Sequence, residues 1–296
     1  MKLNKLTTAF SRILFSLLLI GGLAACSDDD NNGNGKEEPE PAVHPVTSFS
    51  KIQLTEVRTE DPNVPVIVTQ TYLYDKSGRL YSYTYLQNFN AGGETFEIEG
   101  GSSVEYSDHQ AVVTDETGTV STYTLNDKGY AVSCTRQEPG ANLRTYTFSY
   151  LVNTEDKHYL TNITEKLGDG AVYSSVDIEF SGFRSIHIKQ KVGDFEHAGT
   201  AITSPGDEIA NVSEIPYPYL ADQHPLSMHT VAIYGKLLGE PFDYLITQLS
   251  PDNNEESKEI TTYTYTLDDR GIVTSCREVT NSYGVDYRRT VNYTIE

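Results

Sequence analysis

Short runs in which polar and apolar residues alternate fill the chain from about Phe49 onward, and turn residues separate these runs. Clear examples are Val66–Tyr74, Leu143–Tyr150 and Val176–Phe180. Alternation with a period of two, in segments rich in Thr, Tyr, Val and Ile, is typical of β-strands that bury one face. Roughly fifteen such runs follow one another, which predicts an all-β fold, a large curved antiparallel meander that either stays open or closes into a barrel.

The turns between these runs share the pattern Asx-x-x-Gly. It occurs at Asp75–Gly78, Asp115–Gly118, Asn126–Gly129 and Asp268–Gly271. The Asx side chain can accept a hydrogen bond from the backbone two residues later. Glycine in the fourth position can adopt the positive φ that a tight hairpin needs. We therefore interpret these aspartates as turn residues and not as catalytic or calcium-binding groups.

Two longer stretches, Thr122–Cys134 and Thr264–Cys276, match along their length. Each contains a Tyr-x-Leu-Asx-x-x-Gly hairpin and is followed by a further strand, and repetition of such a unit extends one sheet. The cysteines occupy matching places, which usually lie far apart in a repeat. Two buried free thiols are therefore favoured over a disulfide bond, although an exported protein could form one.

One helix is predicted, over Pro225–Leu238, where apolar residues recur at roughly helical spacing. Its proline suits a first turn, and Gly239 and Pro241 mark its end. The two prolines of Ile215–Tyr219 forbid a regular strand, so we expect a loop there. Placed against the concave side of a curved sheet, the helix would cover the core on that side.

The first 25 residues have the features of a signal peptide. Three basic residues precede the apolar run Ile13–Ile20, which is too short to span a bilayer stably. The following segment, Leu23–Cys26, resembles the bacterial lipobox. This resemblance implies that the Cys26 sulfur receives a diacylglyceryl group and that residues 1–25 are cleaved off. We therefore expect Cys26 to be the lipid-anchored first residue of the mature protein.

Residues 26–44 are predicted to form the lipidated cysteine and a flexible acidic tether. Ser27–Pro41 has many charges and no apolar residue, so this stretch cannot fold alone. The acidic run Asp28–Asp30 resembles the surface-export signal of Bacteroidota lipoproteins. We therefore expect an outer-membrane protein exposed at the cell surface, with a periplasm-facing anchor as the alternative. The remaining residues, 45–296, are predicted to form a single all-β domain.

Two further resemblances concern this domain. Tyr72–Leu80 resembles one unit of the tyrosine–aspartate repeats that build large β shells. The lipobox, the Tyr-x-Leu-Asx-x-x-Gly hairpins and Tyr234–Gly239 together resemble a family of Bacteroidota lipoproteins catalogued as a domain of unknown function with a porin-like fold. The likeness implies a strongly curved antiparallel sheet and brings no catalytic residues. A membrane-spanning barrel is disfavoured, because alternate strand positions hold Thr, Ser, Lys and Glu as often as apolar residues.

No pattern of catalytic or metal-binding residues stands out in the sequence. The seven histidines lack the spacing of a zinc protease, and nucleophile-elbow, P-loop and dinucleotide-binding motifs are absent. We therefore predict no catalytic residue, no cofactor, no metal site and no enzymatic activity. A stacking platform for sugars is conceivable, but cross-strand packing pairs are the favoured interpretation of the tyrosines concerned. These are Tyr72, Tyr74, Tyr81, Tyr83 and Tyr85.

The net charge of −20 argues against nucleic acid and anionic lipid surfaces as partners. The tether and the absent motifs favour a non-catalytic binding or adhesion module for a glycan or a protein, held to the membrane through the lipid on Cys26. The alternative is a carrier or chaperone that holds an apolar ligand in the curve of the sheet, and a structural envelope component is a third possibility. A packed concave side would favour surface recognition, whereas a void would favour the carrier.

Overall fold

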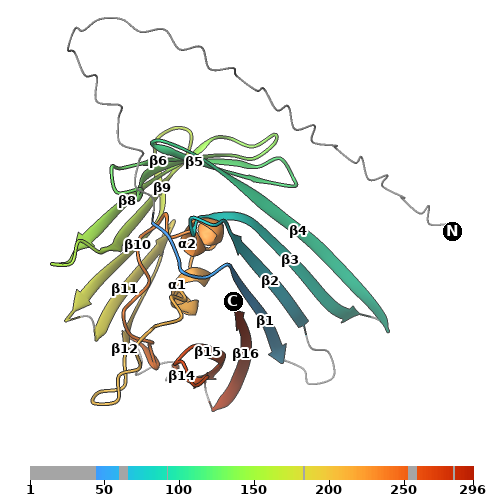
Figure 1. The fold of residues 1–296 in the computed structure, drawn as a ribbon, viewed down its shortest axis with the longest axis vertical. Coiled ribbons are helices and arrows are strands. Elements are labelled where there is room, and N and C mark those ends of the chain that lie inside the picture. Colours follow the sequence, from blue (N-terminus) through green and yellow to red (C-terminus); the bar gives the residue numbers. More distant parts are fainter. Residues whose placement is uncertain (1–44, 60–65, 92, 183, 253–258, 283) are drawn as a thin grey trace, which may run out of the picture. The chain divides into compact units, whose positions relative to one another are not determined.

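The computed structural model describes residues 45–59, 66–91, 93–182, 184–252, 259–282 and 284–296. The predicted signal peptide, Cys26 and the tether lie outside these residues. The described part folds into a closed antiparallel barrel in which each strand pairs with its neighbours in the sequence and β1 pairs with β16 (Figure 1). The predicted meander is confirmed, and the sheet closes.

The barrel has sixteen strands. They are β1 (Lys51–Thr59), β2 (Val66–Tyr74), β3 (Leu80–Ala91), β4 (Glu94–Ser107), β5 (Gln110–Asp115), β6 (Val120–Leu125), β7 (Ala131–Gln137), β8 (Arg144–Val152), β9 (His158–Lys166), β10 (Val172–Ser181), β11 (Ser185–Val192), β12 (Phe195–Ile202), β13 (Gln248–Pro251), β14 (Ile260–Leu267), β15 (Val273–Ser282) and β16 (Val285–Ile295).

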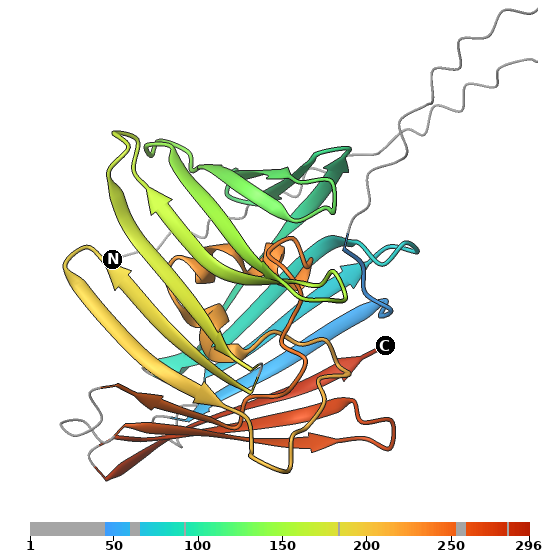
Figure 2. The same ribbon diagram turned by 90° about the vertical axis from the view of Figure 1, so that its left-hand side faces the viewer.

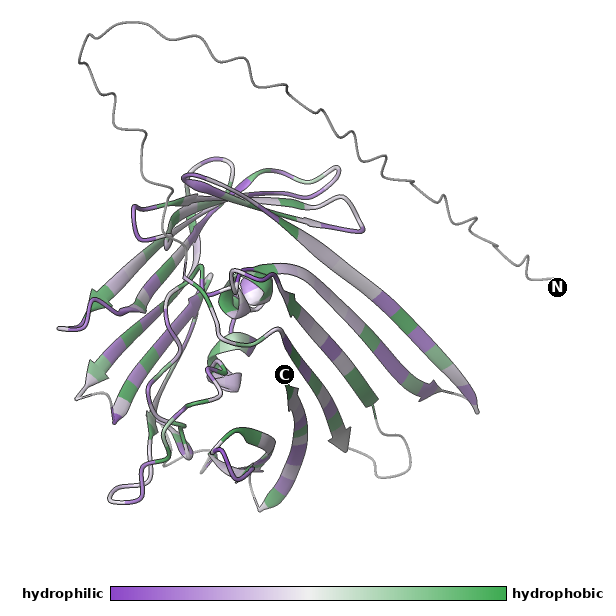
Figure 3. Ribbon diagram, viewed as in Figure 1, coloured by the Kyte–Doolittle hydropathy of each residue, from purple (hydrophilic) through white to green (hydrophobic). Residues whose placement is uncertain are grey.

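The side chains that point into the barrel are mainly apolar, and those on its outer face are mainly polar. On β1, Ile52 and Leu54 are buried, whereas Gln53 lies between them on the outer face and donates a hydrogen bond to Thr71 of β2 at 3.2 Å. Figure 3 displays the same alternation of hydropathy along the strands. Outer-membrane barrels have the opposite orientation, with an apolar band facing outward. This barrel therefore encloses a protein core.

Residues 203–247, between β12 and β13, complete that core from inside the barrel (Figure 2). We call this segment the plug. It contains α1 (Pro218–Asp222), the 3-10 helix η1 (Leu226–His229) and α2 (Thr230–Tyr234). The hydroxyl of Tyr74 on β2 donates to the Tyr234 carbonyl at 3.0 Å, which ties the plug to the wall. Among the described residues, no helix is long and apolar enough to cross a membrane.

The helical part of the plug is shorter than the predicted helix over Pro225–Leu238. It ends at Tyr234, because Lys236 adopts a positive φ of 56° through which a helix cannot continue. The stretch Ile215–Tyr219, predicted as a loop, runs into α1 at Pro218, and a proline is tolerated in the first turn of a helix. The expectation that helix covers the concave side of the sheet is met inside the barrel.

The two ends of the barrel differ. At one end the plug bonds to the strand rim, where the Ala131 amide donates to the Leu237 carbonyl at 2.8 Å. The first described residues and the C-terminus meet at this same end, since the Ser50 amide donates to the Glu296 carbonyl at 2.7 Å. We call it the plugged end. The opposite end, where the turns after β3, β5, β7, β9 and β11 lie, we call the mouth.

The Asx-x-x-Gly turns form as predicted. Asp75 Oδ1 accepts hydrogen bonds from the amides of Ser77 at 2.8 Å and Arg79 at 3.0 Å, and Gly78 has a φ of 75°. A Cβ atom at Gly78 would also overlap the Thr47 carbonyl oxygen. Glycine is therefore required here both by the turn and by the N-terminal segment that packs on it.

The two matching stretches form the β6–β7 and β14–β15 hairpins with the same register. Tyr123 pairs with Cys134, Tyr265 pairs with Cys276, and each hairpin has a bulge at its leucine. Because β7 and β15 are eight strands apart in a ring of sixteen, the two cysteines lie on opposite walls. Both are buried free thiols, as predicted.

Candidate functional site

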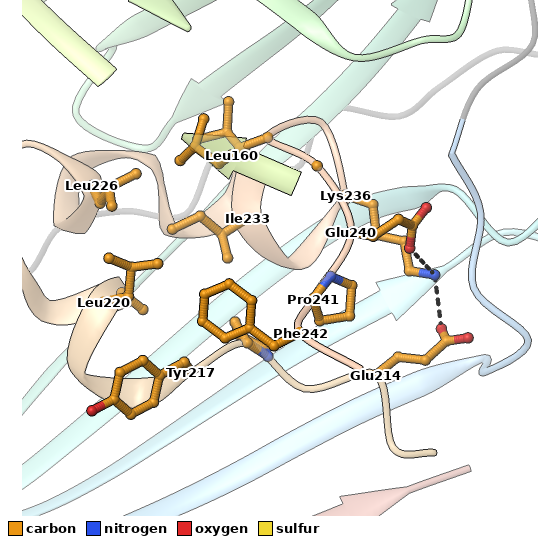
Figure 4. Close-up of a pocket in the computed structure, with 14 residues that line it drawn as sticks. Leu160, Glu214, Tyr217, Leu220, Leu226, Ile233, Lys236, Glu240, Pro241 and Phe242 are labelled. Carbon is orange, nitrogen blue, oxygen red and sulfur yellow. Dashed lines mark ion pairs between the residues drawn. The ribbon is translucent and has the colours of Figure 1, made fainter. Parts of the chain in front are cut away.

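Lys236 fixes the plug at the plugged end. Its ammonium lies 3.0 Å from Glu214 and 3.2 Å from Glu240, and it donates to the Val46 carbonyl at 2.9 Å (Figure 4). Only 9% of this side chain is exposed, and two carboxylates compensate its charge. The Thr47 hydroxyl donates to Glu214 at 2.7 Å. The first described residues and the plug are therefore joined through one charged cluster.

Beside this cluster the plug encloses a small, mostly apolar cavity of about 60 Å³. Leu160, Ile233 and Phe242 are among the residues that line it (Figure 4). Sites for drug-sized ligands have volumes of roughly 300–1,000 Å³. This cavity is therefore too small for a lipid chain, and the interior at this end is occupied by protein.

On one wall the plug is held by Glu165, whose side chain is fully buried. Its carboxylate accepts hydrogen bonds from Arg144 at 2.6 Å and Ser174 at 2.5 Å, and His224 Nε2 of the plug lies 2.7 Å from it. Burial raises the pKa of Glu165, but the bonds from Ser174, Arg144 and His224 outweigh burial and lower it overall. The buried carboxylate therefore stays ionised and ties the plug to β8 and β9.

On the opposite wall the plug is held by Arg289. Its Nη2 donates to Glu56 at 2.7 Å, and its Nη1 pairs with Asp222 of the plug. Burial lowers the pKa of Arg289, but Asp222 and Glu56 outweigh burial and raise it. Arg289 and Asp222 also line a hollow of about 190 Å³ on the mouth side of the plug.

These two clamps occupy equivalent places in the two halves of the barrel. In one half, Cys134 pairs with a residue of β8, and that residue pairs in turn with Glu165 on β9. In the other half, Cys276 pairs with a residue of β16, and that residue pairs in turn with Glu56 on β1. Each glutamate bonds an arginine of the preceding strand in the ring, Arg144 on β8 or Arg289 on β16. The bend of the plug at residues 222–224 is therefore held from opposite walls.

A second pocket, of about 270 Å³, lies between η1 and the wall formed by β3 to β7, toward the mouth. Ser227 of η1 is exposed there and belongs to its floor. The wall combines aromatic, charged and hydroxyl groups. These groups include Tyr83, Tyr85, Ser102, Asp115, Glu116 and Arg136.

A row of stacked tyrosines leads from the plug into this pocket. The rings of Tyr234 and Tyr72 lie 3.8 Å apart, those of Tyr72 and Tyr83 4.9 Å, and those of Tyr83 and Tyr85 6.2 Å. The hydroxyls of Tyr72 and Tyr83 both donate to Gln70, at 2.9 and 3.1 Å. Packing and hydrogen bonds thus fix the row, and the partly exposed ring of Tyr85 ends it in the pocket.

Gly100 of β4 makes room for this ring. A Cβ atom at Gly100 would collide with the Glu116 carboxylate and lie 2.5 Å from Tyr85 Cε1. The other carboxylate oxygen of Glu116 accepts the Gly101 amide at 2.6 Å. The Tyr85 ring and the Glu116 carboxylate therefore both lie across the bare backbone of β4, which holds them in the pocket wall.

Arg136 supplies the positive charge of the pocket. Its Nη1 donates to Ser121 at 3.3 Å and its Nε to Glu138 at 3.2 Å. Within the described chain its Nη2 bonds to no residue, and 17% of the side chain is exposed. Arg136 is therefore positioned by the wall and retains a donor that a ligand can use.

The inner end of the pocket is closed by His229. Its ring is buried, its Nδ1 lies 2.7 Å from the Tyr123 hydroxyl, and it stands edge-on to the Tyr146 ring at 4.4 Å. Burial, together with the nearby Arg136, lowers the pKa of His229 to about 3. The neutral imidazole fits a tautomer that accepts the Tyr123 proton at Nδ1, and within the described chain the buried Nε2 has no hydrogen-bond partner.

The structure places the predicted tyrosine platform only in part. Tyr72 and Tyr74 are buried, Tyr81 is 47% exposed and outside the pocket, and Tyr83 and Tyr85 line it. The favoured interpretation, cross-strand packing, holds for Tyr72 and Tyr83, which pair directly. Sequence reasoning missed Arg136 and Glu116 as pocket residues. The only sequence feature that pointed to them was their position, within an alternating strand for Arg136 and within a turn for Glu116. Asp115, assigned to a turn, lies both in that turn and in the pocket.

Among the described residues, no group of three or more His, Cys, Asp or Glu side chains is placed to hold a metal ion. The predicted lipidation residue, Cys26, lies outside the described residues. The pocket in the mouth brings charged, hydroxyl and aromatic groups together around one hollow, and stacked rings hold its aromatic side chain in place.

A family model described as a domain of unknown function (DUF4595) with porin-like fold matches residues 73–275. The chain belongs to this family. A crystal structure of a porin-like protein from Bacteroides uniformis is 62% identical, with a TM-score of 0.80, and the match covers 87% of this chain and 100% of that one. Another, from Bacteroides vulgatus, is 12% identical with a TM-score of 0.52 over 84% and 98% of the chains, and shares the fold. A comparison with curated protein sequences gives no match.

In this DUF4595 protein the porin-like barrel differs from a pore in how its interior is used. The plug fills the lumen toward the plugged end, where the cavity measures about 60 Å³. The pocket of about 270 Å³ beside η1 lies toward the mouth, and more open hollows of about 300 and 610 Å³ lie near the plugged end around Asp243. The mouth pocket is distinguished from them by the row of stacked tyrosines that ends in it.

Proposed function

We propose that the mature protein is a lipid-anchored, non-catalytic binding module of the bacterial cell envelope, with its ligand site in the mouth of the barrel. The lipobox-like segment Leu23–Cys26 and the apolar run before it support the anchor. The acidic run Asp28–Asp30 supports exposure at the cell surface. The similar porin-like proteins come from Bacteroides, which supports an envelope setting.

The observation that carries the binding proposal is the row of stacked tyrosines that ends, with Tyr85, in the mouth pocket. The described chain begins at the plugged end, and the mouth is the opposite end of the barrel. The mouth also holds the polar and aromatic pocket that contains Tyr85 and Arg136.

The size of the apolar cavity inside the plug weighs against the carrier for an apolar ligand. A carrier needs an enclosed apolar space on the scale of its ligand, roughly 300 Å³ or more. The apolar cavity inside the plug has about 60 Å³. The concave side of the sheet is thus packed where the plug lies against it, which favours recognition at the mouth over enclosure of an apolar ligand.

The anchor is tested by expressing the full chain and its Cys26→Ser variant in the producing bacterium. We expect the native protein in the membrane fraction with the added mass of acyl chains, and the variant in the soluble fraction. Replacing Asp28–Asp30 with alanine then tests surface exposure. Membrane association should persist while a protease added outside the cells loses access to the domain. Unchanged fractionation of the Cys26→Ser variant would refute the anchor.

The binding role is tested by ligand-observed NMR on the purified protein with a library of neutral oligosaccharides, peptides and fatty acids. We expect saturable binding that Tyr85→Ala weakens and Tyr81→Ala leaves intact, because Tyr85 lines the pocket and Tyr81 does not. Binding of fatty acids alone, indifferent to Tyr85→Ala, would support the carrier instead. Absence of binding in every class would contradict the proposed function.

A further inference from the structure

We propose that the mouth pocket is a carbohydrate subsite, in which the face of a neutral pyranose ring packs on Tyr85 and its hydroxyl groups bond to Arg136 and the adjacent carboxylates. This inference rests on the proposed function and narrows it to one ligand class.

The first argument is the position of an aromatic ring. Tyr85 is partly exposed, yet it is held in place by stacking on Tyr83 at 6.2 Å and by its seat over Gly100. A ring that is already ordered loses little conformational entropy when a ligand packs on it. The flat C–H face of a pyranose matches the flat apolar face of a tyrosine.

The second argument is the hydrogen-bonding capacity around that ring. A sugar hydroxyl both donates and accepts, so a sugar site needs donors and acceptors side by side. The pocket offers the Nη2 donor of Arg136, the acceptors Asp115 and Glu116, and the hydroxyls of Ser102 and Ser121. These groups come from four different strands and one turn, and they converge on one hollow.

The third argument is charge. The pocket wall carries two carboxylates, Asp115 and Glu116, against one guanidinium, that of Arg136, on a chain with a net charge of −20. An anionic ligand such as a phosphate or an acidic sugar would meet unfavourable electrostatics. An apolar ligand would strip water from these groups without replacing their hydrogen bonds. A neutral, hydroxyl-rich molecule avoids both costs.

The fourth argument is size. The pocket has about 270 Å³, just below the range of roughly 300–1,000 Å³ for drug-sized ligands. It therefore suits about one or two sugar rings of a longer chain, with the remainder lying along the mouth. The hollow of about 190 Å³ beside Arg289 is on the same side of the plug and offers further polar groups.

The chain contains no tryptophan, so the substitution Tyr85→Trp introduces a single indole at the place where the sugar is expected to stack. We would titrate this variant with maltohexaose, cellohexaose, xylohexaose and mannohexaose, with oligogalacturonate as the anionic comparison. At least one neutral oligosaccharide should give a saturable change of the indole emission, with a Kd between roughly 10 μM and 1 mM. Oligogalacturonate should bind more weakly than that sugar.

The affinity of the native protein for the same sugar is then measured by calorimetry beside three variants. Tyr85→Ala should weaken binding at least about tenfold, whereas Tyr85→Phe should stay within about threefold because it keeps the ring. Tyr81→Ala is the matched control, since Tyr81 is on the same strand, is exposed and lies outside the pocket, and it should leave the affinity unchanged. Circular dichroism and urea midpoints confirm that each variant is folded.

Two results would overturn the inference. One is that no neutral oligosaccharide of the panel binds the native protein or alters the emission of the Tyr85→Trp variant up to about 10 mM. The other is that a sugar binds but Tyr85→Ala and Tyr81→Ala affect it equally, which would place the site elsewhere. If peptides bind in a Tyr85-dependent manner while sugars do not, the proposed binding function stands and the carbohydrate inference fails.

Discussion

Replacing His229 with phenylalanine should change the way in which the stability of the barrel depends on pH. The His229 ring is buried inside the barrel between the plug and the wall, and its pKa is lowered to about 3. In the unfolded chain a histidine titrates near its ordinary value of about 6.5. Between pH 6.5 and pH 3, the unfolded state therefore binds a proton at this histidine and the folded state does not. Stability from this residue is complete above pH 6.5 and is lost as the pH falls toward 3.

The size of this loss follows from the two pKa values. One pKa unit corresponds to about 1.4 kcal/mol, so stability falls by about 1.4 kcal/mol for each pH unit below 6.5. At pH 4.5 the loss from His229 alone is about 2.7 kcal/mol, out of a total that is usually about 5–15 kcal/mol. The slope belongs to one proton and does not depend on how the other histidines titrate, because they are the same in the native protein and the variant.

The His229→Phe variant removes that slope and has its own cost. Phenylalanine keeps an aromatic ring beside Tyr146, but the buried Tyr123 hydroxyl loses its partner. An unpaired buried hydroxyl costs about 1–3 kcal/mol. At pH 7.5 the variant should therefore be the less stable protein by that amount. Because the native protein alone carries the additional loss from His229 on acidification, the two curves should cross near about pH 5.

The assay is urea unfolding at pH 7.5, 6.5, 5.5 and 4.5, followed by far-ultraviolet circular dichroism. A double variant, Tyr123→Phe with His229→Phe, serves as the control because it removes both hydrogen-bonding groups. It should regain most of the stability lost at pH 7.5 and keep the less steep pH dependence of the single variant. If the native protein and His229→Phe lose stability in parallel between pH 6.5 and 4.5, the neutral buried histidine is refuted.

Three further outcomes can be checked with the same preparations. Glu165→Gln removes a fully buried charge and should lower the free energy of unfolding by about 2 kcal/mol at pH 7, measured by urea midpoints. Because the pKa of Glu165 is lowered in the fold, the difference between the two proteins should shrink as the pH falls below the ordinary carboxyl range near 4.5. Gly78→Ala should destabilise by at least about 1 kcal/mol more than Gly140→Ala, which shares the same φ of 75° but has nothing within 4 Å. Cys134 and Cys276, buried on opposite walls with burial raising the pKa of both thiols to about 12, should resist a thiol reagent until urea unfolds the barrel, and reductant should not change the mass.

Local patterns in the sequence predicted the strands and turns well because those features depend on near neighbours. The Asx-x-x-Gly turns and the matching hairpins form with the expected register. One turn of the same kind escaped notice because Asp156, with a φ of 63°, stands where the other turns have glycine. There Asn153 Oδ1 accepts the amides of Glu155 and Lys157, both at 2.9 Å. The hydrogen bonds of the turn depend on its first residue, whereas the Asx-x-x-Gly pattern also required a glycine in the last position.

Closure of the sheet and the path of the plug could not be predicted in this way, because both depend on contacts between distant parts of the chain. β1 meets β16 from the other end of the domain. The helix of the plug ends at Tyr234, before the positive φ of Lys236. The Lys236 ammonium is held by the carboxylates of Glu214 and Glu240, which lie outside the helix. No local propensity of residues 225–238 contains that information.

The candidate site was only partly visible in the sequence for a related reason. Arg136 follows the buried Cys134 by two residues, so alternation alone places both on the same face of β7. Recognising Arg136 as a pocket residue required knowing that this face turns into a lumen and that a plug leaves part of the lumen vacant. Tyr85 was recognised as a possible sugar contact, but within a group of five tyrosines of which the fold buries two.

The paired clamps show what the internal repetition of the barrel does for the plug. A half-turn of the plug about the barrel axis would bring Asp222 to Arg144 and His224 to Glu56, which again joins groups of opposite or complementary character. Ion pairs of this kind stabilise the plug bend between the two walls, but they stabilise both orientations of the plug to a similar degree.

The orientation of the plug must therefore come from contacts that the repetition does not duplicate. Tyr234 stacks on Tyr72 of β2 at 3.8 Å, at an interplanar angle of 14°. Glu56 pairs with Val68 on β2, and the residue four positions later on that strand is Tyr72. Glu165 pairs with Ser174 on β10, and the residue four positions later there is Ile178. An isoleucine offers no ring for Tyr234, so a reversed plug would forfeit the stacked row that ends at Tyr85. The aromatic row that shapes the mouth pocket is thus also the feature that sets the plug in one orientation.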